Sequence, residues 1–178
     1  MDGNTVVIIK STGRKGRAPG EFEFPNGIRL NKAGEIYVCD SDNHRVQVFD
    51  RDLNFLRKFG RRGSGKGCFD NPADLDFDEA GNLYIAEQRN LRIQVLTPQG
   101  DHIRYIGEGV LHDPVSPAVH QNMVYVTDVE GCRIAVFTTS GEFRTSFGEK
   151  ILQRPEGITI DNDGFVYVTD ARSRLIKF

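Results

Sequence analysis

The sequence has little of what marks several common classes of protein. Its longest apolar run, Val6-Val7-Ile8-Ile9, is far too short to span a membrane or to form the core of a signal peptide. Its three cysteines are an odd number without metal-ligand spacing, so we expect reduced thiols and no structural zinc site. No Asn-x-Ser/Thr acceptor occurs. From these absences we expect the cytoplasm as the location.

Motifs that carry catalysis are also lacking. The chain has no Gly-x-Ser-x-Gly elbow, and its glycine-rich segments lack the Gly-Lys-Ser/Thr ending of a phosphate-binding loop. The histidines fall at irregular positions and form no HxH or HExxH motif; they are His44, His102, His112 and His120. We therefore expect no catalytic residue, no metal and no cofactor.

Composition indicates an ordinary soluble globular protein. The chain of 178 residues is long enough for one domain with a real core, and its hydrophobic (38%) and charged (27%) fractions are typical. The formal net charge of −2 gives no global reason to expect nucleic acid, so any such function must rest on local asymmetry.

What the chain does contain is one block of sequence that occurs four times. Each copy opens near a proline and continues into a short β-rich segment with a central tyrosine. These segments are 36–40, 83–87, 124–128 and 166–170. A repeat of about 40 to 50 residues rich in short strands is typical of β-propeller blades. We predict one domain, 1–178, with repeats at 24–60, 71–107, 113–148 and 154–178.

The first copy divides into four short strands, which we expect at 27–30, 35–39, 45–49 and 53–59. Val46 and Val48 alternate with Gln47, which predicts a half-buried third strand. In the third copy, Ser116-Pro117 is expected to interrupt the first strand. No sustained helical period occurs. The pattern predicts an all-β protein, a β-propeller of about four blades of four antiparallel strands.

The two ends of the repeat array suggest how the blades are completed. Segment 5–13 matches a fourth strand, whereas the last copy stops after its third. The N-terminal strand could therefore complete the last blade and close a small ring, hiding two exposed edges. Alternatively, the four blades are part of a larger ring.

The repeats resemble NHL repeats. The resemblance is carried by Pro25-Asn26-Gly27-Ile28, by Gly34 to Asp40, by Asn43 to Phe49 and by the glycine-rich connection 60–69. It is nearest to the C-terminal propeller of tripartite-motif ubiquitin ligases, which bind RNA or protein partners through one face and usually have six blades. The resemblance implies a non-catalytic substrate-recognition module. Some similar propellers are zinc-dependent peptide-amidating lyases, which leaves an enzyme as a remote alternative.

An acidic residue ends the second strand and an arginine begins the third strand of every copy. The pairs are Asp40 and Arg45, Glu87 and Arg92, Asp128 and Arg133, and Asp170 and Arg174. The arginines could form a ring that faces a ligand. Because the pair recurs in every blade, we favour a structural role in which it pins the intervening loop or bridges to the next blade.

Basic residues gather in the connections between blades and in the loops between second and third strands, which emerge on one face of a propeller. The turns of the opposite face carry a net negative charge. A cationic face suits phosphate contacts, although charged glycine-rich loops also serve solubility. The predicted partner-binding residues are Arg14, Lys15, Arg17, Arg61, Arg62, Lys66, Arg89 and Arg172. We expect Phe22 and Phe69 to pack inside the blades. RNA and a protein partner both remain open.

Overall fold

The computed structural model of the protein describes residues 9–172 and 174–178. They form four antiparallel sheets whose strand order follows the chain. The first sheet holds β1 (Pro25–Leu30), β2 (Ile36–Asp40), β3 (Arg45–Phe49) and β4 (Phe55–Phe59). The second holds β5 (Pro72–Phe77), β6 (Leu83–Glu87), β7 (Arg92–Leu96) and β8 (His102–Ile106). The third holds β9 (Pro114–His120), β10 (Met123–Asp128), β11 (Arg133–Thr138) and β12 (Phe143–Phe147).

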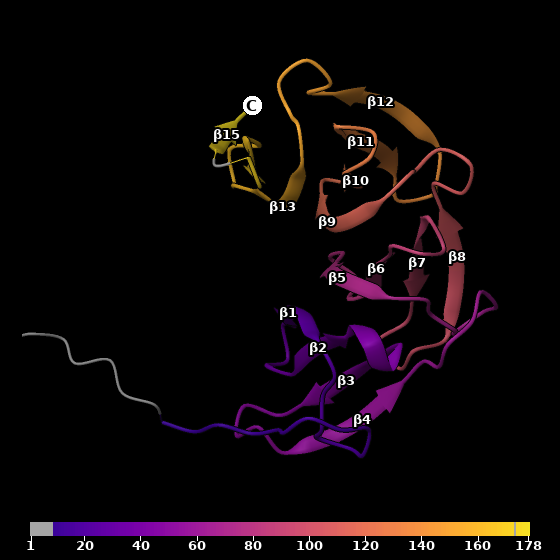
Figure 1. The fold of residues 1–178 in the computed structure, drawn as a ribbon, viewed down its shortest axis with the longest axis vertical. Helices are drawn as coiled ribbons and strands as arrows, with labels where there is room; N and C mark the ends of the chain where they lie inside the picture. Colours follow the sequence, from indigo (N-terminus) through magenta and orange to yellow (C-terminus); the bar gives the residue numbers. More distant parts are fainter. Residues whose placement is uncertain (1–8, 173) are drawn as a thin grey trace, which may run out of the picture.

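The fourth sheet holds β13 (Pro155–Ile160), β14 (Val166–Asp170) and β15 (Arg174–Lys177), and a short 3-10 helix (Ser41–Asn43) links β2 to β3. Figure 1 shows the sheets side by side along an arc, with β1, β5, β9 and β13 on its inner side. This arrangement confirms the predicted propeller of four antiparallel blades.

Closure of a small ring by the N-terminal segment, one of the two alternatives, is not seen in the described residues. Residues 9–12 belong to no strand, and residues 5–8 of the predicted strand lie outside the described part of the chain. The fourth sheet has three strands there, because β15 pairs with β14 alone. The first and last sheets lie on opposite sides of the open part of the arc (Figure 1).

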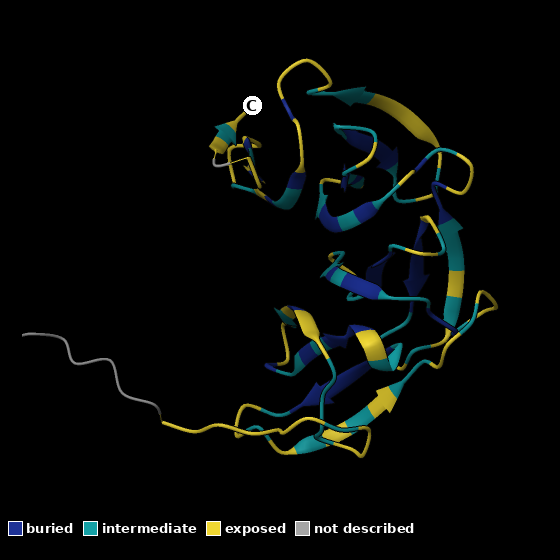
Figure 2. Ribbon diagram, in the orientation of Figure 1, coloured by how far each residue is buried: buried dark blue, intermediate teal, exposed yellow. Residues whose placement is uncertain are grey.

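Apolar layers between successive sheets hold the blades together. Tyr37 and Val46 of the first sheet pack with Leu75 and Ile85 of the second. Equivalent layers lie between the second and third sheets and between the third and fourth. Figure 2 shows buried residues concentrated in the middle strands and in β5 and β9, whereas β1 and the outer strands are more exposed. The burial of these alternating side chains is the main stabilising contribution.

Two expectations about individual strands were wrong. Every residue of β3 is buried, including Gln47, because a connecting segment covers the face that we expected to be exposed. The third copy's first strand is not interrupted, since β9 runs unbroken through Ser116 and Pro117. Pro117 is tolerated because β9 pairs with β10 alone, so its other edge needs no ladder donor.

Each connection between blades begins with a glycine that lies under one large side chain. At Gly60, φ is +97°, and a Cβ atom would come within 2.4 Å of the Phe69 ring. Gly107 has φ of +81° and lies in the same way against Leu111. Glycine is therefore required here by both backbone conformation and space. Phe69 and Leu111 anchor a long and a short connection, respectively.

Candidate functional site

The antiparallel order of the strands separates two faces. Within a blade, the β1–β2 and β3–β4 turns lie at one end, and the β2–β3 loop lies at the other with the connections between blades. We call the second surface the loop face and the first the turn face. The turns of three successive blades converge around one groove on the turn face, which is lined by Asn31, Asp78 and Gln121. The predicted binding residues lie in the connections between blades or in the loops between second and third strands.

Each of the four acid–arginine pairs forms, but the pairs differ in burial. The nitrogen–oxygen distances are 2.7 Å for Arg45–Asp40, 3.1 Å for Arg92–Glu87, 3.0 Å for Arg133–Asp128 and 3.7 Å for Arg174–Asp170. The side chains of Arg45, Arg92, Arg133 and Arg174 are 6%, 5%, 17% and 42% exposed. The first two guanidinium groups are thus too buried to face a ligand.

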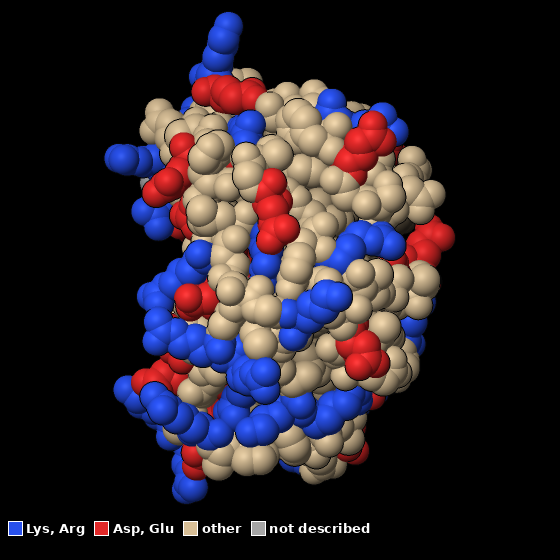
Figure 3. Space-filling model, turned by 90° about the vertical axis from the view of Figure 1, so that its right-hand side faces the viewer, with Lys and Arg blue, Asp and Glu red and all other residues tan. Residues whose placement is uncertain are grey.

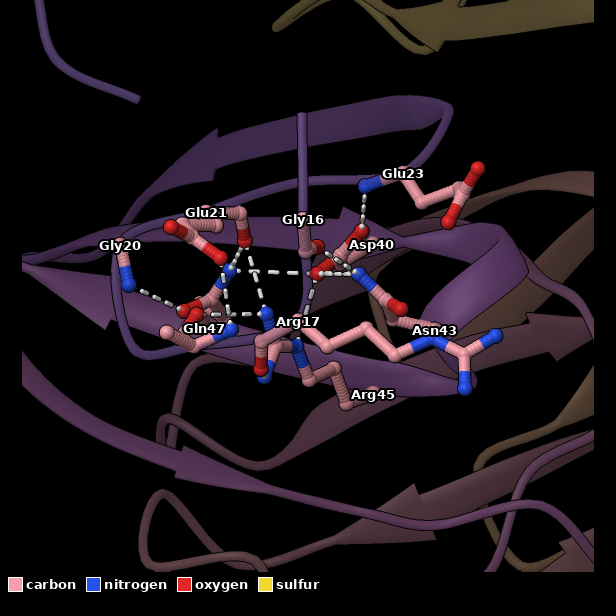
Figure 4. Close-up of polar contacts among 10 residues, drawn as sticks. Gly16, Arg17, Gly20, Glu21, Glu23, Asp40, Asn43, Arg45 and Gln47 are labelled. Carbon is pink, nitrogen blue, oxygen red and sulfur yellow. Dashed lines mark hydrogen bonds and ion pairs between the residues drawn. The ribbon is translucent and has the colours of Figure 1, made fainter. Parts of the chain in front are cut away.

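The pair in the first sheet belongs to a network that holds segment 16–23 (Figure 4). Arg45 donates to the carbonyl oxygens of Arg17 at 2.6 Å and of Glu21 at 2.7 Å. Gln47 donates from Nε2 to the Glu21 carbonyl at 2.7 Å, and its Oε1 accepts from Gly20 N at 2.9 Å. The bonds from the Arg45 guanidinium are charge-assisted and therefore among the strongest in proteins.

The second sheet repeats this network around segment 63–68. Gln94 Nε2 donates to the Cys68 carbonyl at 2.9 Å, and its Oε1 accepts from Gly67 N at 2.8 Å. Arg92 donates to the Ser64 carbonyl at 2.7 Å, and Asn90 donates to the Gly63 carbonyl at 3.0 Å. Sequence reasoning missed both glutamines. Their signal was the shared position in the third strand, together with the two longer connections.

The acidic residues of the third and fourth sheets have different hydrogen-bond partners from those of the first two. Asp128 accepts from the backbone N–H groups of His112 and Asp113, each at 2.9 Å. Burial opposes its ionisation, but these N–H groups and the Arg133 guanidinium outweigh burial and lower the pKa of Asp128 below its usual 3.8. For Glu87 in the second sheet, the effect of burial exceeds that of its hydrogen bonds and of the Arg92 charge, so the pKa of that carboxyl is raised.

The predicted basic residues are exposed. They are Arg14, Lys15, Arg17, Arg61, Arg62, Lys66, Arg89 and Arg172. Arg14 pairs with Glu21 and Lys15 with Glu23. Among the described residues, no carboxylate lies within 4 Å of Arg61, Arg62 or Lys66. Figure 3 shows Lys and Arg side chains gathered over the lower part of the molecule, where Figure 1 places the first two sheets.

His44 lies among these cations without adding to their charge. Its Nδ1 accepts a hydrogen bond from Asn71 N at 3.1 Å, which requires that this nitrogen carry no proton. Burial lowers the pKa of His44, and the charges of Arg62 and Arg89 lower it further against the opposing effect of Asp70. The positive charge of this surface therefore comes from arginine and lysine at neutral pH.

One aromatic side chain on the loop face was missed. Phe24 is 68% exposed with φ of +54°, directly before Pro25, and it lies between two hollows of the loop face. Phe69 is fully buried, and Phe22 packs against Phe49 at 5.7 Å between ring centroids. Exposed Phe24 supplies an apolar surface beside Lys15 that composition alone could not locate.

Residues 9–172 and 174–178 contain no group of three or more His, Cys, Asp or Glu side chains that could hold a metal ion. In the same ranges no helix has the length and apolar character to cross a membrane. Cys39, Cys68 and Cys132 are free thiols.

The sheets and their connections form a β-propeller of repeated antiparallel blades. The NHL-repeat family profile matches residues 22–49 and 152–176. B-box type zinc finger protein ncl-1 of Caenorhabditis elegans is 38% identical over 167 residues, which cover 93% of this chain and 15% of that protein. Protein brain tumor of Drosophila melanogaster is 26% identical over 167 residues, which cover 93% of this chain and 12% of that protein. Human E3 ubiquitin-protein ligase TRIM32 is 40% identical over 45 residues, which cover 25% of this chain and 7% of that protein.

Solved structures show the same fold. A nidogen–laminin complex matches with a TM-score of 0.74 at 21% identity, covering 88% of this chain and 60% of that one. A catalytically inactive virginiamycin B lyase from Staphylococcus aureus matches with a TM-score of 0.65 at 15% identity. The match covers 86% of this chain and 55% of that one. The chain is an NHL-repeat β-propeller that resembles the NHL domains of tripartite-motif proteins. It spans 15% or less of each curated relative named above.

Proposed function

We propose that the loop face of this propeller binds single-stranded RNA, as the non-catalytic recognition module of a tripartite-motif-type ubiquitin ligase in the cytoplasm. The resemblance to tripartite-motif NHL domains supports a macromolecule-binding module, and the charge on the loop face supports a polyanion as its ligand. The observation that carries the proposal is the exposure of Arg61, Arg62 and Lys66 without an acidic partner among the described residues.

Cations that are not already paired are available to phosphates. Each phosphate contact releases bound counterions, so affinity for single strands falls with salt, with a logarithmic slope of about −0.7 per contact. Arg14, Lys15 and Arg17 extend the surface along the first connection, and Arg89 extends it from the second sheet. Arg14 and Lys15 must exchange their pairs with Glu21 and Glu23 for phosphate, which makes them weaker contributors.

The test is fluorescence anisotropy with a random single-stranded RNA pool, titrated across salt concentrations. We expect tight binding that weakens steeply with salt. Arg61→Glu/Arg62→Glu should raise Kd by about tenfold or more and make the salt slope shallower. Lys32→Glu/Arg144→Glu makes the same change in net charge near the turns of the opposite face and should leave Kd nearly unchanged. Absence of binding by well-folded wild-type protein would overturn the proposal.

A protein partner on the same face is the second candidate, favoured by the exposure of Phe24. Aromatic side chains on a surface are enriched where proteins bind one another. This candidate predicts an affinity that survives moderate salt and that Phe24→Ala lowers. Isothermal titration with a partner captured from cell extract, compared at low and moderate salt, separates the two candidates.

A further inference from the structure

We propose that Gln47 and Gln94 are positioning residues for ligand binding, which hold the two long connections so that only the first two blades form the RNA footprint. The inference rests on the proposed function and narrows it to one sector of the loop face. It also predicts that Arg172, on the fourth sheet, lies outside that footprint.

The bonds from the buried side chains reach the backbone beside the cations. Asn90 holds the carbonyl of Gly63, next to Arg62, and Gln94 holds the N–H of Gly67, next to Lys66. In the first connection, Arg45 holds the carbonyl of Arg17 itself. The cationic side chains therefore project from backbone atoms whose positions are fixed.

Both glutamines are completely buried, and each bridges the connection to the acid of its own sheet. Gln47 Nε2 lies 3.2 Å from Asp40 Oδ2, and Gln94 Nε2 lies 2.8 Å from Glu87 Oε1. A buried amide that loses its partners costs free energy, so these bonds fix one path for each connection. The glycine-rich sequences 13–20 and 60–67 would otherwise sample many backbone conformations.

The other two blades lack this arrangement. Ala135 and Ile176 occupy the position of the glutamines in β11 and β15. The connections before these sheets are shorter, and their anchors Leu111 and Leu152 are buried in apolar clusters. Only the first two blades therefore combine a long cationic segment with a buried amide that holds it.

Preorganisation explains why a buried, uncharged side chain should affect affinity. Ordering a flexible segment on binding costs conformational entropy, which a segment already held in place avoids. Gln94→Met keeps the length of the side chain but removes the bonds to Gly67, Cys68 and Glu87. We expect Kd for the RNA pool to rise by about tenfold, the effect of ordering a few loop residues on binding.

The test is a double-mutant cycle read by anisotropy. In the background Arg61→Ala/Arg62→Ala/Lys66→Ala, Gln94→Met should no longer change Kd, because the cations that it positions are gone. Val168→Ala truncates a buried side chain of the fourth sheet, away from the two long connections, and its Kd should equal that of wild type. Arg172→Glu should change Kd less than about twofold.

If Gln94→Met compromises folding, Asn90→Ala replaces it in the cycle, because it releases the Gly63 carbonyl and the Glu87 carboxylate but keeps both bonds of Gln94 to the connection. Hydrogen exchange provides a readout without RNA, since Gln94→Met should speed exchange in residues 61–68 and leave 14–22 unchanged. Equal effects of Gln94→Met in both backgrounds would overturn the positioning role. If wild-type protein binds no RNA, the proposed function fails, and the positioning role in RNA binding fails with it.

Discussion

The first two blades and the last two solve the same structural problem with different chemistry. All four place an acid at the end of the second strand and an arginine at the start of the third. In the first two, a long connection lies over the third strand, and a buried glutamine bonds its backbone. In the last two, a short connection places Leu111 and Leu152 in apolar clusters. A long connection thus accompanies a glutamine in the third strand, and a short connection accompanies Ala135 or Ile176.

The difference extends to the arginines. A long connection covers the guanidinium of Arg45 and supplies carbonyl acceptors to it, whereas Arg174 keeps one carbonyl bond and remains 42% exposed. The acid–arginine pair is therefore part of the interior at one end of the molecule and part of the surface at the other. Equivalent substitutions should have unequal effects.

The largest effect on stability is expected from substituting the arginines of the acid–arginine pairs. Arg45→Ala leaves the buried Asp40 carboxylate without its guanidinium and should lower the free energy of unfolding by about 3 kcal/mol. Arg174→Ala removes a partly exposed partner and should cost less than about 1 kcal/mol. Urea denaturation of both variants measures the difference. Equal losses would contradict the distinction between a buried and an exposed pair.

A smaller effect is expected from pH. A fall in pH should change the free energy of unfolding in opposite directions through Asp128 of the third sheet and Glu87 of the second. The lowered pKa of Asp128 means that its stabilisation is fully present above 3.8 and is lost as pH falls through the folded-state value. The raised pKa of Glu87 means that the folded state binds its proton more tightly than the unfolded state does, so stability falls as pH rises through and above 4.5.

Urea denaturation from neutral pH down to about pH 3 tests this contrast. Relative to Asp128→Asn, wild-type protein should lose stability toward the acid end of the range. Relative to Glu87→Gln, wild-type protein should gain stability as pH falls. Parallel pH profiles for the two comparisons would show that the two carboxyls do not differ as described.

The smallest effect is expected in the turns of the turn face. The turn after β5 has Gly81 at φ of +87°, whereas the turn after β9 has Gln121 at +46° and Asn122 at +64°. Gly81→Ala should destabilise the protein by about 1 kcal/mol. Gln121→Gly should stabilise it by at most about 0.5 kcal/mol, because greater freedom of the unfolded chain offsets part of the relieved strain. Thermal denaturation measures both changes.

The repeats and strands could be predicted because each blade repeats the same alternation of apolar residues and the same turn residues. The burial of Gln47 could not, since an alternating strand suggests that every second residue faces solvent. What covers Gln47 is segment 16–22, which is distant in sequence and has no strand pattern of its own. The exposure of Phe24 was missed for a related reason, because a backbone at φ of +54° turns its ring out of the blade.

The acid–arginine pairs could be recognised from their recurrence, but their unequal burial could not. Burial depends on the connection that precedes each sheet, and its length alone does not show which carbonyl groups will face the guanidinium. Arg92 illustrates this point, since it bonds Ser64 from the connection and also Glu108 from the following one.

The arrangement of the sheets along an arc has a consequence for cooperativity. Most of the packing between sheets joins immediate neighbours, as β1 with β5, β5 with β9 and β9 with β13. In such arrays each unit draws its stability from itself and the units beside it, so order is lost from the ends more easily than from the middle. Within the described residues, the second sheet is bordered by a blade on either side and should therefore retain its structure longest.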